Sequence, residues 1–427
     1  MRDLVFVSLE PWNAIWRRNQ FLCAHLAHRF PDMRLLFVES PLFLPHLVRE
    51  RKRVPSFARR LKRIEEFPNI RVFTPFKPLP NPLPGGRALN EATMRAQIGR
   101  AARLVGVRDP LLWLNPFDFG FLTNSLNEYG VVYDITDDWE LAAGSEEEKA
   151  RIERLDREMC RRADLTVVCS RALYDSRKEV AKRLLLLPNG VDAEHYEDVE
   201  SRDKRPIGTF DEQGAFHLSE GASLPAEPSK GKYDIAHWTR PVFGYTGSLH
   251  PERIDLNIVK EIACAFPQGR VVLVGPDHFG EGALAREFKE FPNVFTPGAV
   301  SYSSIPLVMA GFDVCIVPHQ KSQFVESLNP IKLWEFLAAG KPIVSVDVAG
   351  FRDFPGLVRL ASDAPSFVAA CRDALQEVNA CVGISPRVPC QREARRQVAQ
   401  QHSWNARLDE LLDELESTGL IEAEVTA

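Results

Sequence analysis

Residues 327–345 combine the residue types of a phosphate-binding helix that is followed by a buried strand. Asn329 suits the cap position of this helix, Pro330 suits its first helical position, and Gly340 suits the left-handed position after its last turn. The N-terminus of a helix attracts phosphate, because its first N–H groups have no partner within the helix and carry partial positive charge. Phosphate is therefore the predicted ligand of this end of the helix.

Two charged side chains share another face of the same predicted helix. Lys332 and Glu335 are neighbours on the helix surface, because they lie one turn apart. Lys332 could meet a diphosphate, and the Glu335 carboxylate could hold ribose hydroxyls. With Asn329, Pro330 and Ile331 lining the helix N-terminus, the segment offers the groups that a nucleoside diphosphate needs.

The elements that must position this helix follow an alternation of strands and helices along the chain. This alternation predicts parallel sheets. The strands predicted in the first half cover residues 4–8, 34–39, 70–74, 111–114, 131–135, 165–169 and 184–187, with amphipathic helices over 19–30 and 91–104. The scheme repeats from Val242 to about Leu375, and a polar helix and a leucine-bearing helix follow after Val388.

The 427-residue length favours two domains. We predict an α/β fold with one parallel-sheet domain at residues 1–190 and a second at residues 241–387. Residues 191–240 form the predicted junction and surface insertion, partly mobile, because this stretch is rich in glycine, proline, serine and charge. Residues 388–427 are the predicted C-terminal helices.

Further segments stand in a fixed order around the predicted phosphate-binding helix. They are Leu-Pro-Asn-Gly-Val-Asp at 187–192, Phe-Gly-Tyr-Thr-Gly-Ser-Leu at 243–249, and the strand-like segments at 271–276, 293–300 and 312–318. Together with residues 327–345 they resemble the retaining glycosyltransferases of family 4, of the glycosyl transferases group 1 type. This resemblance implies the GT-B architecture, in which two Rossmann-like domains face each other across a cleft. Residues 1–190 would then be the acceptor-binding domain and residues 241–387 the nucleotide-sugar-binding domain. It also implies that the terminal helices pack back toward the first domain, and the alternative is a simple closing helix on the second domain.

The resemblance also implies roles for residues of the second domain. Gly247, Ser248 and Arg253 would approach the diphosphate, and Glu335 would hold the ribose. Arg253 and Lys332 would act in catalysis by stabilising the charge that develops on the leaving group.

Two positions depart from the family's pattern. Glu335 matches the second of two glutamates in the family's motif, whereas Ser327 stands at the position of the first, next to Glu326. Ser248 stands where the family commonly has arginine, and Arg253 stands where it commonly has lysine. These departures bear on the identity of the donor more than on the fold.

The loop after the first predicted strand is the candidate acceptor site, since open parallel sheets bind ligands outside the carboxyl ends of their strands. Trp12 and Trp16 could stack on a sugar, and Arg17, Arg18 and Asn19 could hydrogen-bond to it. The alternative is that this loop starts a helix in which tryptophan is a packing anchor.

Carboxylates at the end of the predicted strand 131–135 are candidates for proton transfer. Asp137 and Asp138 could orient an acceptor hydroxyl or take its proton, and clustering could raise one pKa into a useful range. The alternative roles are helix capping and solvated loop charge. In enzymes of the family that this chain resembles, the leaving phosphate is thought to help deprotonate the acceptor, so a protein base is not strictly required.

Residues 49–63 form a basic segment with Glu50 as its one acidic residue and apolar residues interleaved. Such a segment suits an anionic membrane surface or a polyprenyl-phosphate-linked acceptor, and the alternative is a solvated basic face. Its cations are Arg49, Arg51, Lys52, Arg53, Arg59, Arg60, Lys62 and Arg63.

Composition sets further limits. The net charge of −5 gives no general attraction to nucleic acid. Cys169, Cys264 and Cys315 lie in apolar runs and are predicted to be buried thiols, which favours a reducing compartment. No cluster has zinc-ligand spacing, so no metal or other cofactor is expected, the nucleotide sugar being a substrate. The chain begins directly with a predicted strand and has no long apolar run, which predicts a cytoplasmic protein, peripheral on the inner face of the plasma membrane if the basic segment binds it.

The predicted function is transfer of a sugar from a nucleotide-sugar donor to an acceptor hydroxyl of a glycan or lipid-linked acceptor, with retention, in cell-surface polysaccharide or glycolipid synthesis. Two alternatives remain open. The first is a non-catalytic GT-B relative that acts as a scaffold, because Ser248 and Ser327 replace two usual polar anchors. The second is a GT-B nucleotide-sugar epimerase. A dinucleotide-dependent dehydrogenase is disfavoured, because no G-x-G-x-x-G follows a strand.

Overall fold

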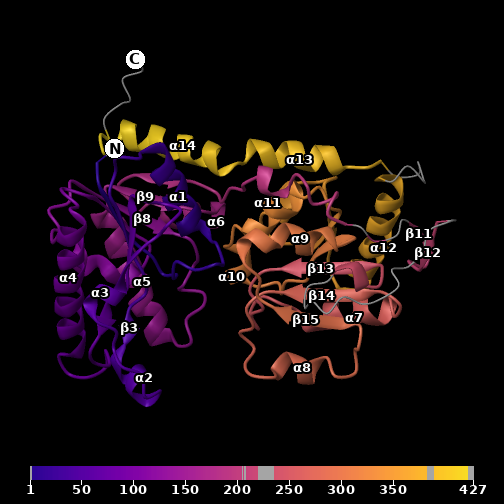
Figure 1. The fold of residues 1–427 in the computed structure, drawn as a ribbon, viewed down its shortest axis with the longest axis horizontal. Helices are drawn as coiled ribbons and strands as arrows, with labels where there is room; N and C mark the ends of the chain where they lie inside the picture. Colours follow the sequence, from indigo (N-terminus) through magenta and orange to yellow (C-terminus); the bar gives the residue numbers. More distant parts are fainter. Residues whose placement is uncertain (1, 204, 206–207, 220–234, 382–388, 422–427) are drawn as a thin grey trace. The chain divides into compact units, whose positions relative to one another are not determined.

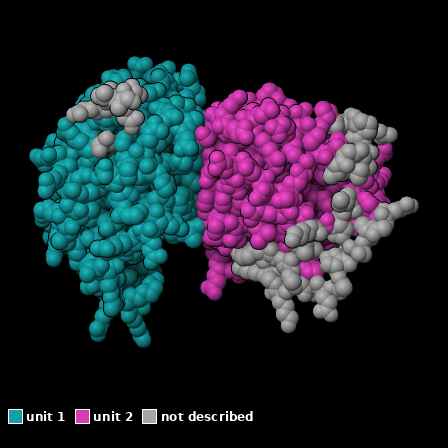
Figure 2. All heavy atoms as spheres, turned by 45° about the horizontal axis from the view of Figure 1, so that its top comes forward, with its two compact units in different colours: residues 1–188, 404–427 teal, residues 189–403 magenta. Residues whose placement is uncertain are grey.

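The computed structural model describes residues 2–203, 205, 208–219, 235–381 and 389–421. The chain divides into two compact units, which Figures 1 and 2 show as ribbon and as spheres. Unit 1 consists of residues 1–188 and 404–427, and unit 2 consists of residues 189–403. Each unit is built on its own mainly parallel sheet, which confirms the predicted α/β class.

Unit 1 contains an eight-stranded sheet that is parallel except for the edge pair β4–β5. All strands predicted in the first half are present. Most of them are apolar runs that are buried on both faces, whereas the edge strand at residues 184–186 is half-buried. The edge strand β4 and the small pair β3–β6 were not predicted. In spatial order the strands are β10 (Leu184–Leu186), β9 (Leu165–Val168), β8 (Gly130–Ile135), β7 (Leu111–Leu114), β1 (Leu4–Val7), β2 (Leu35–Val38), β5 (Ile70–Phe73) and β4 (Leu61–Arg63), and the small pair is β3 (Leu42–Phe43) with β6 (Phe76–Lys77).

The helices of unit 1 include the two predicted in its first half, although α4 begins five residues earlier than expected. Within unit 1, α14 packs against α1, with the rings of Phe21 and Trp404 stacked at 5.0 Å. The helices are α1 (Arg18–Arg29), α2 (Leu44–Arg49), α3 (Phe57–Arg60), α4 (Gly86–Val105), η1 (Phe117–Leu122), α5 (Glu146–Arg162), α6 (Arg171–Arg177) and α14 (Trp404–Ser417).

Unit 2 contains a six-stranded sheet in which every pair is parallel. In spatial order the strands are β15 (Val294–Gly298), β14 (Arg270–Val274), β13 (Val242–Thr246), β16 (Val314–Val317), β17 (Ile343–Val346) and β18 (Val358–Ala361). Its helices are η2 (Glu194–Tyr196), η3 (Ile235–His237), α7 (Leu256–Ala265), α8 (Ala283–Glu287), η4 (Tyr302–Ser304), α9 (Ile305–Ala310), α10 (Gln323–Glu326), α11 (Ile331–Ala338), η5 (Phe351–Asp353), α12 (Ala364–Cys381) and α13 (Arg392–Gln401).

Part of the predicted insertion is packed onto unit 2. Strands β11 (Gly208–Phe210) and β12 (Phe216–Leu218) form an antiparallel pair. Asn379 of α12 holds this pair through both main-chain groups of Phe210, accepting from its N–H at 3.0 Å and donating to its carbonyl at 2.8 Å. Residues 204, 206–207 and 220–234 of the insertion lie outside the described residues.

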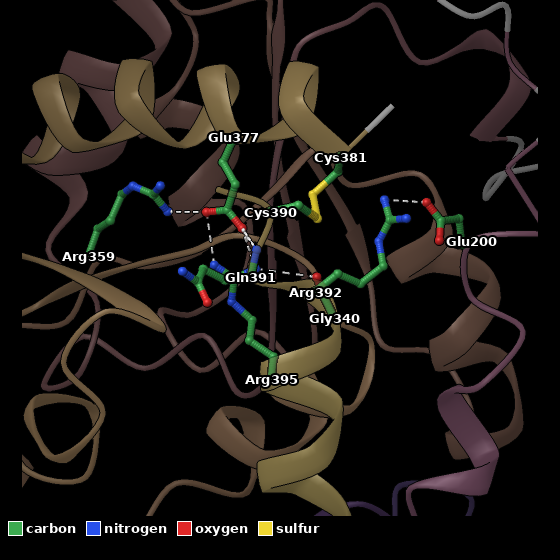
Figure 3. Close-up of a disulfide and its surroundings, with 9 residues drawn as sticks. All are labelled: Glu200, Gly340, Arg359, Glu377, Cys381, Cys390, Gln391, Arg392 and Arg395. Atoms are coloured by element: carbon green, nitrogen blue, oxygen red, sulfur yellow. Dashed lines mark hydrogen bonds and ion pairs between the residues drawn. A yellow bond between two sulfur atoms is a disulfide. The ribbon is translucent and has the colours of Figure 1, made fainter. Parts of the chain in front are cut away.

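A buried carboxylate joins α12, α13 and β18 within unit 2, as Figure 3 shows. Glu377 accepts from the Arg395 guanidinium at 2.7 and 3.0 Å and from Arg359 at 2.6 Å. The guanidinium groups lower the pKa of Glu377, although burial opposes them and is the largest single influence. Loss of either partner would leave an unpaired buried charge, on Glu377 of α12 or on Arg395 of α13.

The cysteines differ from the sequence prediction in two respects. Cys381 and Cys390 form a disulfide at the end of α12, with their Cα atoms 4.9 Å apart (Figure 3). Cys264 is exposed, so the prediction that it is buried is wrong, whereas Cys169 and Cys315 are buried free thiols as predicted. Cys264 lies on the exposed side of the amphipathic helix α7. Apolar neighbours in the sequence do not show which side of a helix a residue occupies.

The basic segment covers the end of α2, all of α3 and strand β4. Arg60 is only 5% exposed and is not a surface charge. Its guanidinium donates to the Thr74 carbonyl at 2.9 Å and to Gln97 at 2.7 Å. The other cations of the segment are exposed. No helix among the described residues is both long enough and apolar enough to span a membrane.

Candidate donor site in unit 2

The turn after β13 forms one wall of the site. The chain bends at Gly247, which has φ of 140°, and packs against a second glycine turn at Gly275 after β14. A Cβ at Gly275 would lie 1.8 Å from the Gly247 carbonyl oxygen, and a Cβ at Gly247 would lie 2.8 Å from Lys332 Cε. The two backbones and the lysine therefore approach one another because neither glycine has a side chain.

Helix α11 supplies the opposite wall and begins one residue later than predicted. Pro330 is its cap residue and Ile331 its first helical residue, so the prediction that Asn329 is the cap is wrong. The Asn329 side chain instead accepts from the Asn189 main-chain N–H at 2.8 Å and from Trp334 Nε1 at 3.4 Å. Asn329 cannot cap the helix while its oxygen serves these two donors.

Lys332 lies between the glycine turn and the sheet. Its ammonium sits 5.2 Å from the ring centroid of Tyr245 and next to Gly247. Burial and, to a smaller extent, the charge of Arg253 lower the pKa of Lys332 to about 8, although Glu335 opposes both. A lysine held in this way gains most from a ligand that brings negative charge.

The buried rings of Tyr245 and His319 lie next to Lys332 on the side of the sheet. The Tyr245 hydroxyl donates to the Ser248 carbonyl at 3.3 Å and lies 3.5 Å from His319 Nε2. His319 is 2% exposed, and burial together with Lys332 and Arg253 holds its pKa well below the usual range. This geometry favours a structural role for His319.

Arg253 stands at the end of the turn that leads into α7. Its guanidinium lies 5.3 Å from the ring centroid of Phe324, and its carbonyl accepts from the Gln320 N–H at 2.8 Å. The charge of Arg253 contributes to the lowered pKa of Lys332. Gly247, Ser248 and Arg253 thus lie in the segment between β13 and α7, and Lys332 of α11 lies against Gly247. Donor binding by these residues stays a prediction.

Glu335 lies one turn further along α11, in a setting that the sequence did not reveal. Burial raises the pKa of Glu335, and the neighbouring Tyr196 and Lys332 lower it in part. Burial and the charges of Glu335 and Asp192 also raise the pKa of Tyr196 and of Tyr302. These partners are far from Glu335 in sequence, so no local spacing could have indicated them.

The family's first glutamate has no substitute here. Ser327 is 2% exposed, and its hydroxyl donates to the Phe324 carbonyl at 2.7 Å. Glu326 accepts from the Arg352 guanidinium at 2.8 and 2.9 Å. Both side chains are therefore engaged within unit 2, and Glu335 is the carboxylate that α11 presents.

The predicted acceptor residues of unit 1 are largely engaged within the unit. Arg18 is 3% exposed and donates to Asp134 at 3.2 Å and to the Leu187 carbonyl at 2.9 Å. Asn19 is buried and donates to Ser8 Oγ at 2.8 Å. Arg17 precedes α1 and pairs with Glu10 at 3.3 Å.

The two tryptophans of the same loop belong to an aromatic cluster. Trp12 packs edge-on against Phe37 at 5.1 Å and Trp16 against Phe21 at 5.2 Å, and each also contacts Phe67. Both indoles remain partly exposed. They are thus packing anchors that keep one edge at the surface, and acceptor binding stays a prediction for them.

The two candidate aspartates after β8 differ in their surroundings. Asp138 is 9% exposed and pairs with Arg177, which also binds Glu140 at 3.0 Å and Asp156 at 3.0 Å. Asp137 is partly exposed and accepts from Thr136 Oγ1 at 3.2 Å. Asp137 is therefore better placed than Asp138 to meet a ligand. Within the described ranges, no group of three or more His, Cys, Asp or Glu side chains is arranged to hold a metal ion.

Comparison with known proteins agrees with the geometry of unit 2. Residues 240–377 match the sequence pattern of the family described as "Glycosyl transferases group 1". A Bacillus subtilis protein named "Putative teichuronic acid biosynthesis glycosyltransferase TuaH" is 30% identical over 168 residues, which is 38% of this chain and 40% of that protein.

Solved structures resemble the chain over almost its whole length. Anabaena HepE in complex with UDP and glucose has a TM-score of 0.64 at 16% identity, with 98% of this chain and 100% of that chain covered. The α,α-trehalose 6-phosphate synthase of Burkholderia multivorans has a TM-score of 0.62 at 13% identity, with 98% and 99% covered. The predicted GT-B fold is confirmed by these likenesses, and the predicted resemblance to glycosyl transferases group 1 is confirmed for residues 240–377.

Proposed function

We propose that this protein transfers a sugar from a nucleotide-sugar donor to an acceptor hydroxyl, with retention. The observation that carries the proposal is the position of Lys332 and Glu335. They lie on one helix, α11, beside the glycine turn at Gly247, within the segment that matches the glycosyl transferases group 1 pattern. This arrangement places a cation and a carboxylate one turn apart on the same helix, where the cation could meet a diphosphate and the carboxylate a ribose.

The diphosphate would lie between the Gly247–Ser248 turn and the first turn of α11. The first main-chain N–H groups of α11 suit phosphate, because a helix N-terminus presents donors and partial positive charge. Residues 329–331 would line the helix end, and Arg253 and Lys332 would add positive charge. Glu335 would accept hydrogen bonds from the ribose hydroxyls, as the resemblance implies.

In the proposed reaction the bond between the sugar and the diphosphate breaks, and negative charge develops on the departing nucleotide. Lys332 and Arg253 would stabilise this charge more in the transition state than in the ground state. The acceptor hydroxyl would lose its proton to the leaving phosphate, with Asp137 available to orient it. No metal ion is assigned a role, because the two cations would supply the positive charge.

We propose a cell-surface glycan or lipid-linked glycan as the acceptor. The name of the Bacillus subtilis relative refers to teichuronic acid biosynthesis, and the similarity to it covers 38% of this chain. That name describes another protein, and it supports the proposed acceptor here.

A membrane-borne acceptor would also give the basic segment a role. We propose that α2 and the loop after it dock unit 1 on an anionic membrane surface on the cytoplasmic side. Phe43 is 38% exposed and Val48 is 64% exposed, and Arg49, Arg51 and Lys52 lie beside them in the chain. Apolar side chains that insert and cations that meet phosphate headgroups are the combination that an anionic bilayer attracts.

A thermal-shift screen with UDP, GDP, ADP and dTDP sugars tests the proposal. A donor at about 100 times its dissociation constant stabilises the folded protein by about 2.7 kcal/mol. The selected sugar is then incubated with the protein, and the products are analysed. Transfer or slow hydrolysis with retained configuration is expected. Binding without turnover would favour the scaffold alternative, and conversion of the free nucleotide sugar to its epimer would favour the epimerase.

A further inference from the structure

Asn189 holds the segment that leads into α11. Its main-chain N–H donates to Asn329 Oδ1 at 2.8 Å, and its side-chain amide donates to the Asn329 carbonyl. Asn189 is 7% exposed, so water does not compete freely for these bonds. Two residues that are 140 positions apart in sequence are thereby joined at two points immediately before the helix that carries Lys332 and Glu335.

The same end of α11 is held from a second direction. Trp334 is 4% exposed, donates from Nε1 to Asn329 Oδ1 at 3.4 Å, and stacks on His402 with ring centroids 4.4 Å apart. The His402 carbonyl in turn accepts from the Val191 N–H at 3.1 Å. Asn189, Asn329, Trp334 and His402 therefore form one connected set around the first turn of α11, which we call the α11 clasp.

The other end of α11 is fixed by the buried ion-pair network. Gly340 follows the helix with φ of 68°, and Arg395 donates to its carbonyl at 3.4 Å and to the Leu357 carbonyl at 2.9 Å. Arg395 is itself held by Glu377 (Figure 3). Because the C-terminal end of α11 is anchored independently, the α11 clasp determines the direction and the axial position of the N-terminal end of this helix.

We propose that Asn189 is a positioning residue for the donor site. Through Asn329 it fixes the N-terminal turn of α11, and this turn sets where Lys332 and Glu335 meet the nucleotide. The inference rests on the proposed function, because it supposes that a nucleotide binds at α11. Asn189 itself need not touch the ligand.

The test uses the full chain and Asn189→Ala, with Asn379→Ala as the matched control. Asn379 is 4% exposed in the same unit and also makes two hydrogen bonds to a distant main chain, but it holds β11 rather than α11. The probe is whichever of UDP, GDP, ADP and dTDP the wild-type protein binds. Melting temperature and dissociation constant are measured for each variant. Both variants are expected to melt lower, and only Asn189→Ala is expected to bind the nucleotide about tenfold more weakly.

A second variant, Asn329→Ala, opens the clasp from the other side and serves if Asn189→Ala fails to fold. The double variant is expected to bind no more weakly than the weaker single variant, since both changes break the same contacts. Unchanged affinity in folded Asn189→Ala or Asn329→Ala, equal losses in Asn189→Ala and Asn379→Ala, or multiplied losses in the double variant would overturn the inference alone. A wild-type protein that binds none of the nucleotides would overturn the proposed function and the inference with it.

Discussion

At the scale of single residues, the site depends on how Lys332 is charged. Burial lowers its pKa to about 8, so the lysine loses its proton above that pH in the free protein. A bound diphosphate would restore a higher pKa, because it places negative charge beside the ammonium. Nucleotide binding should then take up a proton above pH 8, and affinity should fall as the pH rises through this range.

We predict that the dissociation constant of the nucleotide does not change below about pH 7.5 and rises above pH 8, by at most about tenfold per pH unit. Calorimetric titration between pH 7 and pH 9.5 measures it. The Lys332→Arg variant keeps its charge over this range, so its affinity should not follow the same curve. A wild-type affinity that does not change up to pH 9.5 would contradict the assignment of Lys332 to the diphosphate.

The two cations of the site should be partly redundant. Arg253→Ala and Lys332→Ala are each expected to reduce the transfer rate, and the double variant is expected to be nearly inactive, because Arg253 and Lys332 would stabilise the same developing charge. Initial rates at saturating donor measure this. If both single variants turn over like the wild type, the diphosphate lies elsewhere. Loss of activity in EDTA that added metal restores would show that a metal supplies the charge instead.

At the scale of elements, two glycine substitutions distinguish a steric clash of the new Cβ from the cost of a positive φ. Gly275→Ala should destabilise unit 2 severely, because the new Cβ would lie 1.8 Å from the Gly247 carbonyl oxygen. Gly280 also has a positive φ, of 101°, but a Cβ there meets nothing within 4 Å. Gly280→Ala should therefore cost only the conformational penalty, about 1–2 kcal/mol. Chemical denaturation measures both, and equal losses would contradict the close approach of the two turns.

The elements show what the sequence could predict. Buried parallel strands are continuous apolar runs, so β1 and the other central strands were predictable within a residue or two. The two-residue strands β3 and β6 and the hairpin β11–β12 carry no such run. Strands β3 and β6 pair with each other, and the hairpin is held by Asn379 of α12. Local pattern does not report partners that are distant in sequence.

The candidate site divides in the same way. Lys332, Glu335 and Gly247 were predictable because helix spacing and a glycine turn are local features. The role of Asn329 was not, because its side-chain oxygen accepts from the main-chain N–H of Asn189, 140 positions away, and from Trp334 instead of capping the helix. Arg60 was counted as a surface cation for a similar reason, since its partners Thr74 and Gln97 come from β5 and α4 or their flanks.

At the scale of the whole molecule, charge distribution matters more than net charge. The chain carries −5 overall, while α2 and the following loop are basic and lie at the edge of unit 1 in Figure 1. Each basic side chain near an anionic membrane contributes about 1 kcal/mol. Changing Arg51, Lys52 and Arg53 to Glu should therefore abolish binding to anionic liposomes at low salt. Arg60 is left unchanged, because it is buried and its loss would test stability.

Cosedimentation with phosphatidylglycerol vesicles measures this binding, with neutral phosphatidylcholine vesicles as the reference. The matched control changes Arg103, Arg108 and Arg154 to Glu, exposed cations of unit 1 that give the same change in net charge. It should bind like the wild type. If the wild-type protein ignores anionic vesicles at low salt, or if both triple variants lose binding equally, the basic segment is a solvated surface.

The central claim is that α11 of unit 2 binds a nucleotide sugar through Glu335. Calorimetric titration with the nucleotide sugar that the screen selects tests it on three proteins: the wild type, Glu335→Ala and Glu326→Ala. Glu326 is the natural control, because it is the other carboxylate near α11 but is paired with Arg352. We predict that Glu335→Ala remains folded and loses about 1.5–3 kcal/mol of binding free energy, the contribution of hydrogen bonds to a charged group, while Glu326→Ala binds like the wild type. Unchanged affinity in folded Glu335→Ala would contradict the account.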